Sequence, residues 1–232
     1  MRREDEVEEY QDGLRYDLAS DPGKLALAVR LYESCIPSDF SDVKDEDVIH
    51  NRHVWEKIIL PYCEKAAKAR SSGYGLYLEG DNGVGKTMFL CYLLSAVIRM
   101  GYTAYYTTAL ELDLNLKRGI TDFSVMDRMN HLLLYSDFLG LDEMSKERCR
   151  PEDNWIRSQI ERVLKFRHDY GLPTVVATNA NLERIGEIYG GSVRSVLRGK
   201  YYRAAFLPGD IRRNVQDRMR ADMGFPSIKK ER

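Results

Sequence analysis

Length, composition and charge are typical of a soluble chain of ordinary size. The 232 residues predict one domain, or one domain with an appendage, and 44% hydrophobic residues are enough to bury a sizeable core. The formal net charge of −1 gives no sign of a chain that binds nucleic acid or a membrane through its overall charge.

The four cysteines lie far apart and include no C-x-x-C pair, which argues against a zinc site and a secreted disulfide framework. We recognise no signal peptide, and no apolar run reaches the ~18 residues that a membrane span needs. We therefore expect a cytoplasmic protein.

Charge is unevenly distributed along the chain. Residues 1–22 hold eight acidic and three basic residues, and residues 194–232 hold eleven basic and four acidic residues. The acidic head and the basic end suggest different partners, although solvated surfaces would give the same pattern.

Two helical regions come first along the chain. "DPGKLALAVRLYESCIPSDF" predicts a helix with Asp21 as its cap and Pro22 at its first position, stopped by Pro37. Residues 48–73 predict a second helical region that is bent or divided at Pro61 and ends at Gly73.

Strands and helices alternate from residue 74 onward. The expected strands are 74–79, 103–108, 138–142, 174–178 and 201–206. The expected helices are 86–99, 110–117, about 122–135, 154–170, 182–197 with a break at 190–191, and 210–224. This alternation predicts an α/β fold of three layers on a mostly parallel five-stranded sheet, without room for a substantial C-terminal lid domain.

A glycine-rich loop follows the first expected strand. "GDNGVGKT" matches G-x-x-x-x-G-K-[ST], in which backbone N–H groups cradle phosphates at a helix N-terminus. Lys86 is expected to reach the β- and γ-phosphates, and Thr87 to ligate Mg²⁺. The alternative is a glycine-rich turn with a chance lysine. The predicted nucleotide-binding residues are Gly80, Asp81, Asn82, Gly83, Val84, Gly85, Lys86, Thr87 and Met88.

Polar residues end two later strands. Asp142 is expected to hold the Mg²⁺ shell, and Glu143 to orient and activate the attacking water. Read alone, such a pair is more often a helix start or a surface pair. Asn179 is a candidate sensor of the γ-phosphate; the alternative, a helix cap, could be supplied by Asn181. The guanine-reading motif N/T-K-x-D is absent from the sequence, so the predicted nucleotide is ATP.

These three elements, in this order, resemble an AAA+ ATPase. "CIPSDF", "GYGLYLEGDNGVGKTMFL", "LGLDEM", "PTVVATNANLERI" and "FLPGDIRR" look like the DnaC/DnaI-type helicase loaders and their IstB relatives, over about residues 35 to 213. The resemblance implies an acidic N-terminal extension with a partner-docking helix at 1–35, an AAA+ ATPase domain at 36–213, and a short basic helix and tail at 214–232.

The implied function is an ATP-hydrolysing loader that binds a hexameric replicative DNA helicase and helps place it on single-stranded DNA during replication initiation. The alternative is an IstB-like transposition ATPase that assembles on double-stranded DNA. A third reading is a regulatory module that uses ATP only as a switch. The intact pair of Asp142 and Glu143 argues against this reading.

Proteins of this family complete each ATP site with an arginine from a neighbouring subunit. The resemblance implies Arg194 for this finger, with Arg198 as the alternative, although the family's Ser/Asp-Arg-Leu context reads Ser-Val-Leu here. It implies Arg212 as a second, sensor-type arginine that neutralises γ-phosphate charge, with Arg213 as the fallback. The plainer readings are a solvated basic face for Arg194 and Arg198, and an ordinary arginine at a helix N-terminus for Arg212.

The resemblance also implies a DNA contact in "LDLNLKRGITDFSVMDRMNHL", where Lys117 and Arg118 are candidates for phosphate binding. Phe123 is a weaker candidate for base stacking, because a lone phenylalanine more often belongs to a core. Family loaders often carry a longer, separately folded N-terminal domain, whereas about 35 residues precede "CIPSDF" here. Either a helix over residues 22–34 docks on the helicase, or the chain does not load a helicase as the others do. Leu25, Val29 and Tyr32 would form the contact face of this helix, unless the helix packs on its own ATPase domain.

Overall fold

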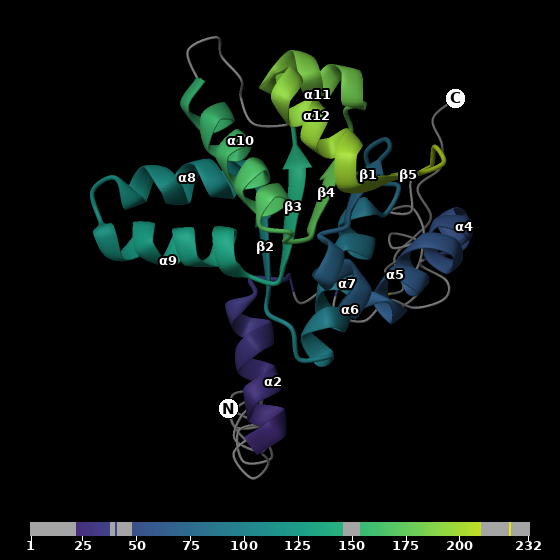
Figure 1. The fold of residues 1–232 in the computed structure, drawn as a ribbon. Coiled ribbons are helices and arrows are strands. Elements are labelled where there is room, and N and C mark those ends of the chain that lie inside the picture. The colour runs from purple at the N-terminus through teal and green to yellow at the C-terminus, as the bar shows by residue number, and fades with distance from the viewer. Residues whose placement is uncertain (1–21, 38–39, 41–47, 146–153, 210–222, 224–232) are drawn as a thin grey trace.

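The computed structural model describes residues 22–37, 40, 48–145, 154–209 and 223. Its centre is a sheet of five parallel strands in the order β2-β3-β4-β1-β5 (Figure 1). The strands are β1 (Gly75–Glu79), β2 (Ala104–Thr108), β3 (Phe138–Met144), β4 (Thr174–Thr178) and β5 (Tyr201–Ala205). Every residue of β4 is buried, as expected for a central parallel strand that is covered on both faces. The predicted α/β fold is confirmed.

Helices cover both faces of the sheet and give three layers. Leu76 and Leu78 of β1 face one apolar cluster, and Tyr77 between them faces the other, as the alternation of a strand requires. The first layer holds α4 (Arg52–Val54), α5 (Leu60–Glu64), α6 (Ala66–Ser72) and α7 (Lys86–Arg99). The second holds α8 (Ala109–Gly119), α9 (Phe123–Tyr135), α10 (Asn154–Asp169), α11 (Leu182–Tyr189) and α12 (Gly191–Lys200).

The helical region before the sheet divides next to Pro61, as predicted, and again at a second place. A π-helical turn, Trp55–Ile59, directly precedes α5, and Pro61 occupies the first turn of α5. The Leu60 N–H donates to the Trp55 carbonyl in the π-helical pattern, and Pro61 has no N–H to continue this series. The second break lies at Lys65, between α5 and α6, and the region ends as expected at Gly73, whose φ is +68°.

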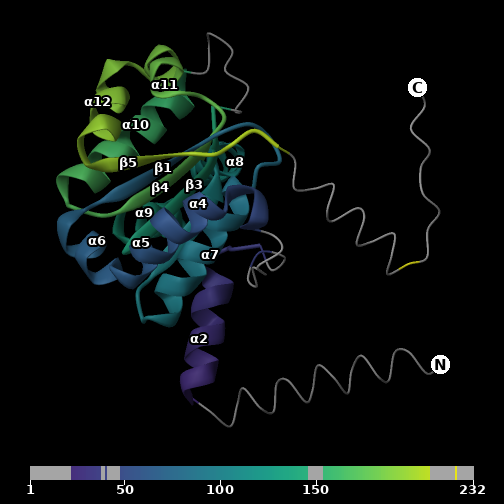
Figure 2. The ribbon, with the colours of Figure 1, turned by 90° about the vertical axis from the view of Figure 1, so that its right-hand side faces the viewer.

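Helix α2 (Pro22–Glu33) projects beyond the end of the sheet at which the strands begin (Figures 1 and 2). Leu27 and Leu31 pack against the first apolar cluster. The helix ends at Glu33, because the backbone soon leaves the helical region, with a φ of +57° at Cys35. The Ser34 hydroxyl donates to the Leu31 carbonyl at 2.6 Å. The Ser34 carbonyl then accepts from the Tyr106 N–H at 2.8 Å, and this bond covers part of the outer edge of β2.

Helices α8 and α9 form a hairpin between β2 and β3 (Figure 1). Thr108 and Glu111 form a capping box at the start of α8, and the Asp122 carboxylate caps α9. Gly119 lets the two helices approach closely, because a Cβ there would lie 3.0 Å from the Met126 Cε. The local sequence therefore specifies this hairpin well, although α8 is longer than predicted.

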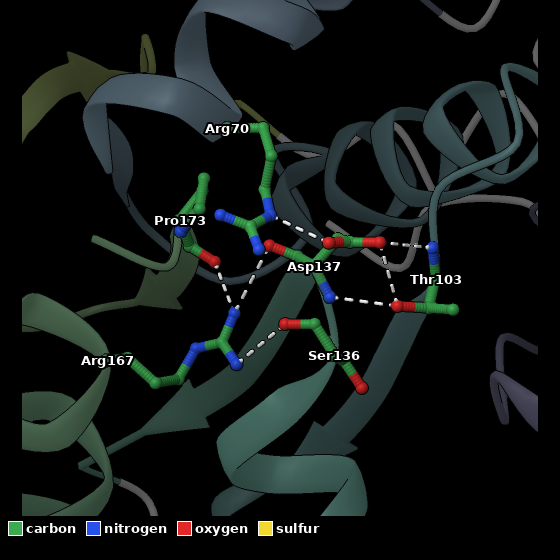
Figure 3. A network of polar contacts seen from close by, with 6 residues as sticks. All are labelled: Arg70, Thr103, Ser136, Asp137, Arg167 and Pro173. Atoms are coloured by element: carbon green, nitrogen blue, oxygen red, sulfur yellow. Dashed lines mark hydrogen bonds and ion pairs between the residues drawn. The ribbon is translucent and has the colours of Figure 1, made fainter. Parts of the chain in front are cut away.

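At the amino edge of the sheet, where the strands begin, a fully buried arginine joins several elements (Figure 3). Arg167 of α10 donates to the carbonyls of Leu133 and Ser136 at 3.0 Å and of Pro173 at 2.7 Å. Its Nε donates to the Thr174 hydroxyl at 2.9 Å. Burial lowers the pKa of Arg167 to about 10, which still leaves the side chain charged near neutral pH.

An ion pair continues this network towards the surface. Arg70 of α6 contacts the Asp137 carboxylate at 2.7 Å, and that carboxylate also accepts from the N–H and hydroxyl of Thr103, each at 3.0 Å (Figure 3). Burial opposes ionisation of Asp137, but the hydrogen bonds from Arg70 and Thr103 prevail and lower its pKa.

The described helices include none that is long and apolar enough to cross a membrane. The final expected helix, 210–224, lies outside the described residues apart from Met223, and with it lie Arg212 and Arg213.

Candidate nucleotide-binding site

The phosphate-binding loop joins the end of β1 to the start of α7. Gly83 and Gly85 have φ values of +81° and +100°, in the left-handed region that favours glycine. Gly80 permits a close approach, because a Cβ there would lie 2.8 Å from the Phe206 Cβ. The loop therefore has the glycines that its conformation requires, and it opens a helix whose first N–H groups favour an anion.

Lys86 lies over this loop with 8% of its surface exposed. Its ammonium group donates to the carbonyls of Gly80 and Asp81 at 2.9 and 2.7 Å, and to the Asn179 Oδ1 at 2.8 Å. All of these acceptors are oxygens at hydrogen-bonding distance, so a phosphate oxygen is a chemically suitable replacement for any of them.

Asp142 lies near the carboxyl end of β3 and is 2% exposed. Its Oδ2 accepts from the Thr87 hydroxyl at 2.7 Å and from the Tyr106 hydroxyl at 3.0 Å. Burial and the Asp142 carboxylate raise the pKa of Tyr106 far above its usual value, so this phenol remains a donor. Adjacent carboxylate and hydroxyl oxygens fit the preferences of Mg²⁺, which Thr87 and Asp142 would hold.

Glu143 sits in an irregular part of β3. The pairing with β4 shifts register between Leu141 and Met144, and Glu143 has a φ of +54°. This conformation is uncommon for a residue with a side chain, and a bulge of this kind redirects the side chain relative to its neighbours. The predicted strand ended at Asp142, and the actual strand continues through Met144.

A hydroxyl network holds the end of β3. The Thr178 hydroxyl donates to the Met144 carbonyl at 2.5 Å and lies 3.2 Å from the Ser145 hydroxyl. The Ser145 N–H donates to the Tyr189 hydroxyl at 3.0 Å, which connects the strand end to α11. Ser145, Tyr189 and Tyr106 were missed by sequence reasoning, because none of them belongs to a recognisable local motif.

Asn179 follows β4 and contacts the phosphate-binding loop. Besides accepting from Lys86, its amide donates to the Asn82 Oδ1 at 2.8 Å. The cap of α11 is Asn181, whose Oδ1 accepts from the Arg184 N–H at 2.8 Å. The structure thus brings the candidate sensor to the loop and rules out the helix-cap alternative for Asn179.

No family model matches the chain. The chain is 28% identical over 116 residues to the replicative helicase loader DnaI of Bacillus subtilis (strain 168), a match that covers 50% of this chain and 36% of that protein. The resemblance to DnaC/DnaI-type AAA+ ATPases is confirmed. Because the match spans about a third of DnaI, it does not extend to that whole protein.

Two solved structures show the same fold at low sequence identity. The crystal structure of the DnaC helicase loader matches with a TM-score of 0.58 and 20% identity, covering 77% of this chain and 99% of that chain. The replication initiator DnaA bound to AMPPCP and single-stranded DNA matches with a TM-score of 0.62 and 12% identity, covering 84% of this chain and 58% of that chain. These matches establish an AAA+ fold.

In this AAA+ fold, both candidate finger arginines lie on α12 and contact α11. Arg198 pairs with Glu183 at 3.0 Å. The half-buried Arg194 packs across Gly186, where an added Cβ would lie 3.0 Å from the Arg194 Cδ. The single chain therefore anchors both side chains to the neighbouring helix, and a role in another subunit's site stays a prediction.

The candidate DNA-contacting residues lie near the end of the α8–α9 hairpin. Lys117 pairs with Asp113 at 2.7 Å on an exposed face, and Arg118 is exposed. Phe123 is 86% exposed, so the expectation that it belongs to the core is wrong. The hairpin presents basic and aromatic side chains together with Ile120, which is 62% exposed.

Proposed function

We propose that the chain is an ATP-hydrolysing helicase loader, which binds a hexameric replicative DNA helicase and helps place it on single-stranded DNA during replication initiation. This proposal rests on one observation: Lys86, Thr87 and Asp142 lie together at the carboxyl ends of the strands of an AAA+ sheet. The sequence similarity to DnaI supports loading over transposition.

ATP is the proposed substrate, held by residues 80–88. Lys86 exchanges an acceptor of its own loop for a phosphate oxygen, and Asn179, which contacts Lys86, senses the γ-phosphate through its amide. Glu143 orients the attacking water and accepts its proton. Mg²⁺, held by Thr87 and Asp142, supplies charge neutralisation for the phosphates when bound.

Self-association completes the proposed site. Arg194, or Arg198 in its place, acts in the ATP site of a neighbouring copy, and Arg212 acts from its own chain. Contacts of these arginines with an adjacent γ-phosphate neutralise charge that develops during hydrolysis. Residues 36–213 form the proposed ATPase domain, and residues 214–232 its basic continuation.

The proposed contact with single-stranded DNA is the α8–α9 hairpin. Lys117 and Arg118 bind phosphates, and the exposed ring of Phe123 is available for base stacking. The presence of single-stranded DNA in the matching DnaA structure supports a nucleic-acid role for this fold without fixing these residues.

Helix α2, within the extension 1–35, is the proposed helicase-docking element. One side of it packs on its own domain through Leu27 and Leu31. Leu25, Val29 and Tyr32 are 46, 45 and 86% exposed, at a spacing that places them along a second face. The alternative that α2 packs on its own domain is therefore confirmed for the side that carries Leu27 and Leu31. The exposed face is the one that we propose docks into a groove on the helicase.

The first experiment measures ATP-dependent binding to single- and double-stranded DNA by fluorescence anisotropy at fixed salt, with hydrolysis followed in the same samples. Preference for single strands with stimulated turnover is the expected result. Preference for duplex, with ATP-dependent filaments, would instead indicate an IstB-like ATPase. Lys117→Ala and Arg118→Ala should each weaken DNA binding, and Lys165→Ala on α10, which also removes one positive charge, is the control. Absence of DNA binding would contradict the loader.

A further inference from the structure

A buried asparagine outside every recognised motif connects two parts of the site. Asn51 is 2% exposed. Its Nδ2 donates to the Val84 carbonyl, within the phosphate-binding loop, at 3.1 Å. Its Oδ1 accepts from the Leu207 N–H, just after β5, at 2.8 Å. Both polar atoms of one side chain are therefore bonded to backbone that lies far away in sequence.

The bond to Val84 fixes the direction of a neighbouring donor. The Val84 carbonyl and the Gly85 N–H belong to one planar, trans peptide unit, so they point in opposite directions. Because Asn51 holds the carbonyl towards the interior, the Gly85 N–H points away from the interior. Gly85 also has a φ of +100° and is the N-cap of α7, so this peptide sets the turn that forms the anion cradle.

The bond to Leu207 ties the loop to the segment after the last strand. That segment is held at neighbouring points, because the Phe206 N–H donates to the Glu79 carbonyl at 2.8 Å. The His50 Nε2 lies 2.6 Å from the Pro208 carbonyl. Residues 50 and 51 therefore hold the backbone that leads to residues 210–213.

We propose that Asn51 is a positioning residue for the phosphate-binding loop. Its amide presets the Gly85 N–H for a nucleotide phosphate and couples the loop to residues 207–208. The inference rests on the proposed ATP binding, and it assigns Asn51 no contact with the nucleotide.

The test compares Asn51→Ala, Asn51→Leu and the control His50→Ala, which removes a bond to the same segment without touching the loop. Titration with a fluorescent ATP analogue in Mg²⁺ gives Kd, steady-state hydrolysis gives kcat, and thermal melting without nucleotide reports folding. Alanine leaves space for water to bond the freed backbone groups, whereas leucine fills the space and excludes water.

If the amide positions the loop, Asn51→Ala raises Kd at least about tenfold, and Asn51→Leu raises it further, because the Val84 carbonyl then has no partner. The kcat at saturating ATP stays within about twofold of the wild type, as expected when ground and transition states lose the same binding. His50→Ala keeps the wild-type Kd.

A residue that only fills space predicts the reverse order, with leucine closer to the wild type than alanine. That order, or a folded Asn51→Ala with the wild-type Kd, would overturn the inference. If the leucine variant does not fold, the Kd of Asn51→Ala is the deciding measurement. A wild type that fails to bind ATP would contradict the proposed function instead.

Discussion

The sheet has an amino edge, where the parallel strands begin, and a carboxyl edge, where they end. Each of these two edges buries a cation against carbonyl oxygens, with different consequences. At the amino edge, Arg167 is 0% exposed and bonds to carbonyls from the ends of several elements. At the carboxyl edge, Lys86 is 8% exposed, and two of its acceptors belong to its own glycine-containing loop. The first arrangement is set by the packing of the domain, and the second by a loop that a ligand can enter.

This difference shows how the same interaction serves stability or function. Five guanidinium donors in a planar group match several fixed carbonyls at once, which suits a permanent junction. A lysine ammonium is a compact charge on a flexible stem, so it can exchange one oxygen acceptor for another. The expectation is that the amino edge governs folding and the carboxyl edge governs nucleotide chemistry.

The largest expected effect is on chemistry at the carboxyl edge. Glu143→Gln removes the proposed base but retains its size, so ATP hydrolysis should fall by roughly 10²- to 10⁴-fold while ATP binding persists. Phosphate release and analogue titration measure the two quantities. Glu187→Gln, on the exposed side of α11, is the control and should hydrolyse ATP normally. Normal turnover in Glu143→Gln would show that another group is the base.

At the amino edge, Arg167→Met should destabilise the fold by about 3 kcal/mol, because it leaves several buried carbonyls without their donor. The folded fraction should bind ATP with the wild-type Kd. Urea denaturation gives the free energy of unfolding, and nucleotide titration under native conditions gives Kd. A loss of ATP affinity without a loss of stability would contradict the separation of the two edges.

The matched change at the carboxyl edge is Lys86→Met. Loss of the ammonium group should weaken ATP binding at least about 100-fold, because charge-assisted bonds to phosphate disappear. The free energy of unfolding should change by less than about 1 kcal/mol, since the freed loop carbonyls are near the surface and can bond water. Calorimetric titration and denaturation of the same preparation compare directly with Arg167→Met.

Sequence reasoning works well where the functional residues lie close together in the sequence, in short local motifs. The glycines and Lys86 follow β1, Asp142 and Glu143 lie at the end of β3, and Asn179 follows β4; parallel strands bring their ends to one edge. The sequence therefore predicts both the fold class and the candidate site.

Long-range contacts to single side chains give no such signal. Asn51 meets Val84 and Leu207 only because the helical region before β1 packs beneath the loop. Helical spacing from the buried Val163 and Leu164 places Arg167 on the inner face of α10, but no local pattern shows which carbonyls it contacts there. The bulge at Glu143 depends on the pairing with β4, so its conformation could not be predicted either.

The smallest expected effect sharpens the account of the amino edge. The pKa of Asp137 is lowered from 3.8 in the folded state, so the unfolded chain binds the proton more readily in acid. The stabilisation of the fold by the ionised Asp137 carboxylate is therefore present above the pKa that this group has in the unfolded chain. It is lost as pH falls through the lower pKa of the folded state. Because the side chains of Arg70 and Asp137 are 34 and 27% exposed, the contribution is at most about 1 kcal/mol.

Asp137→Asn provides the comparison, because asparagine keeps the shape of the side chain and cannot ionise. The stability advantage of the wild type over this variant should shrink as pH is lowered from about 5 to about 2, and denaturation at several pH values measures it. Arg70→Met should remove most of that advantage at neutral pH. A constant advantage across this range would mean that the Thr103 bonds and packing, rather than the charge, connect Asp137 to the sheet.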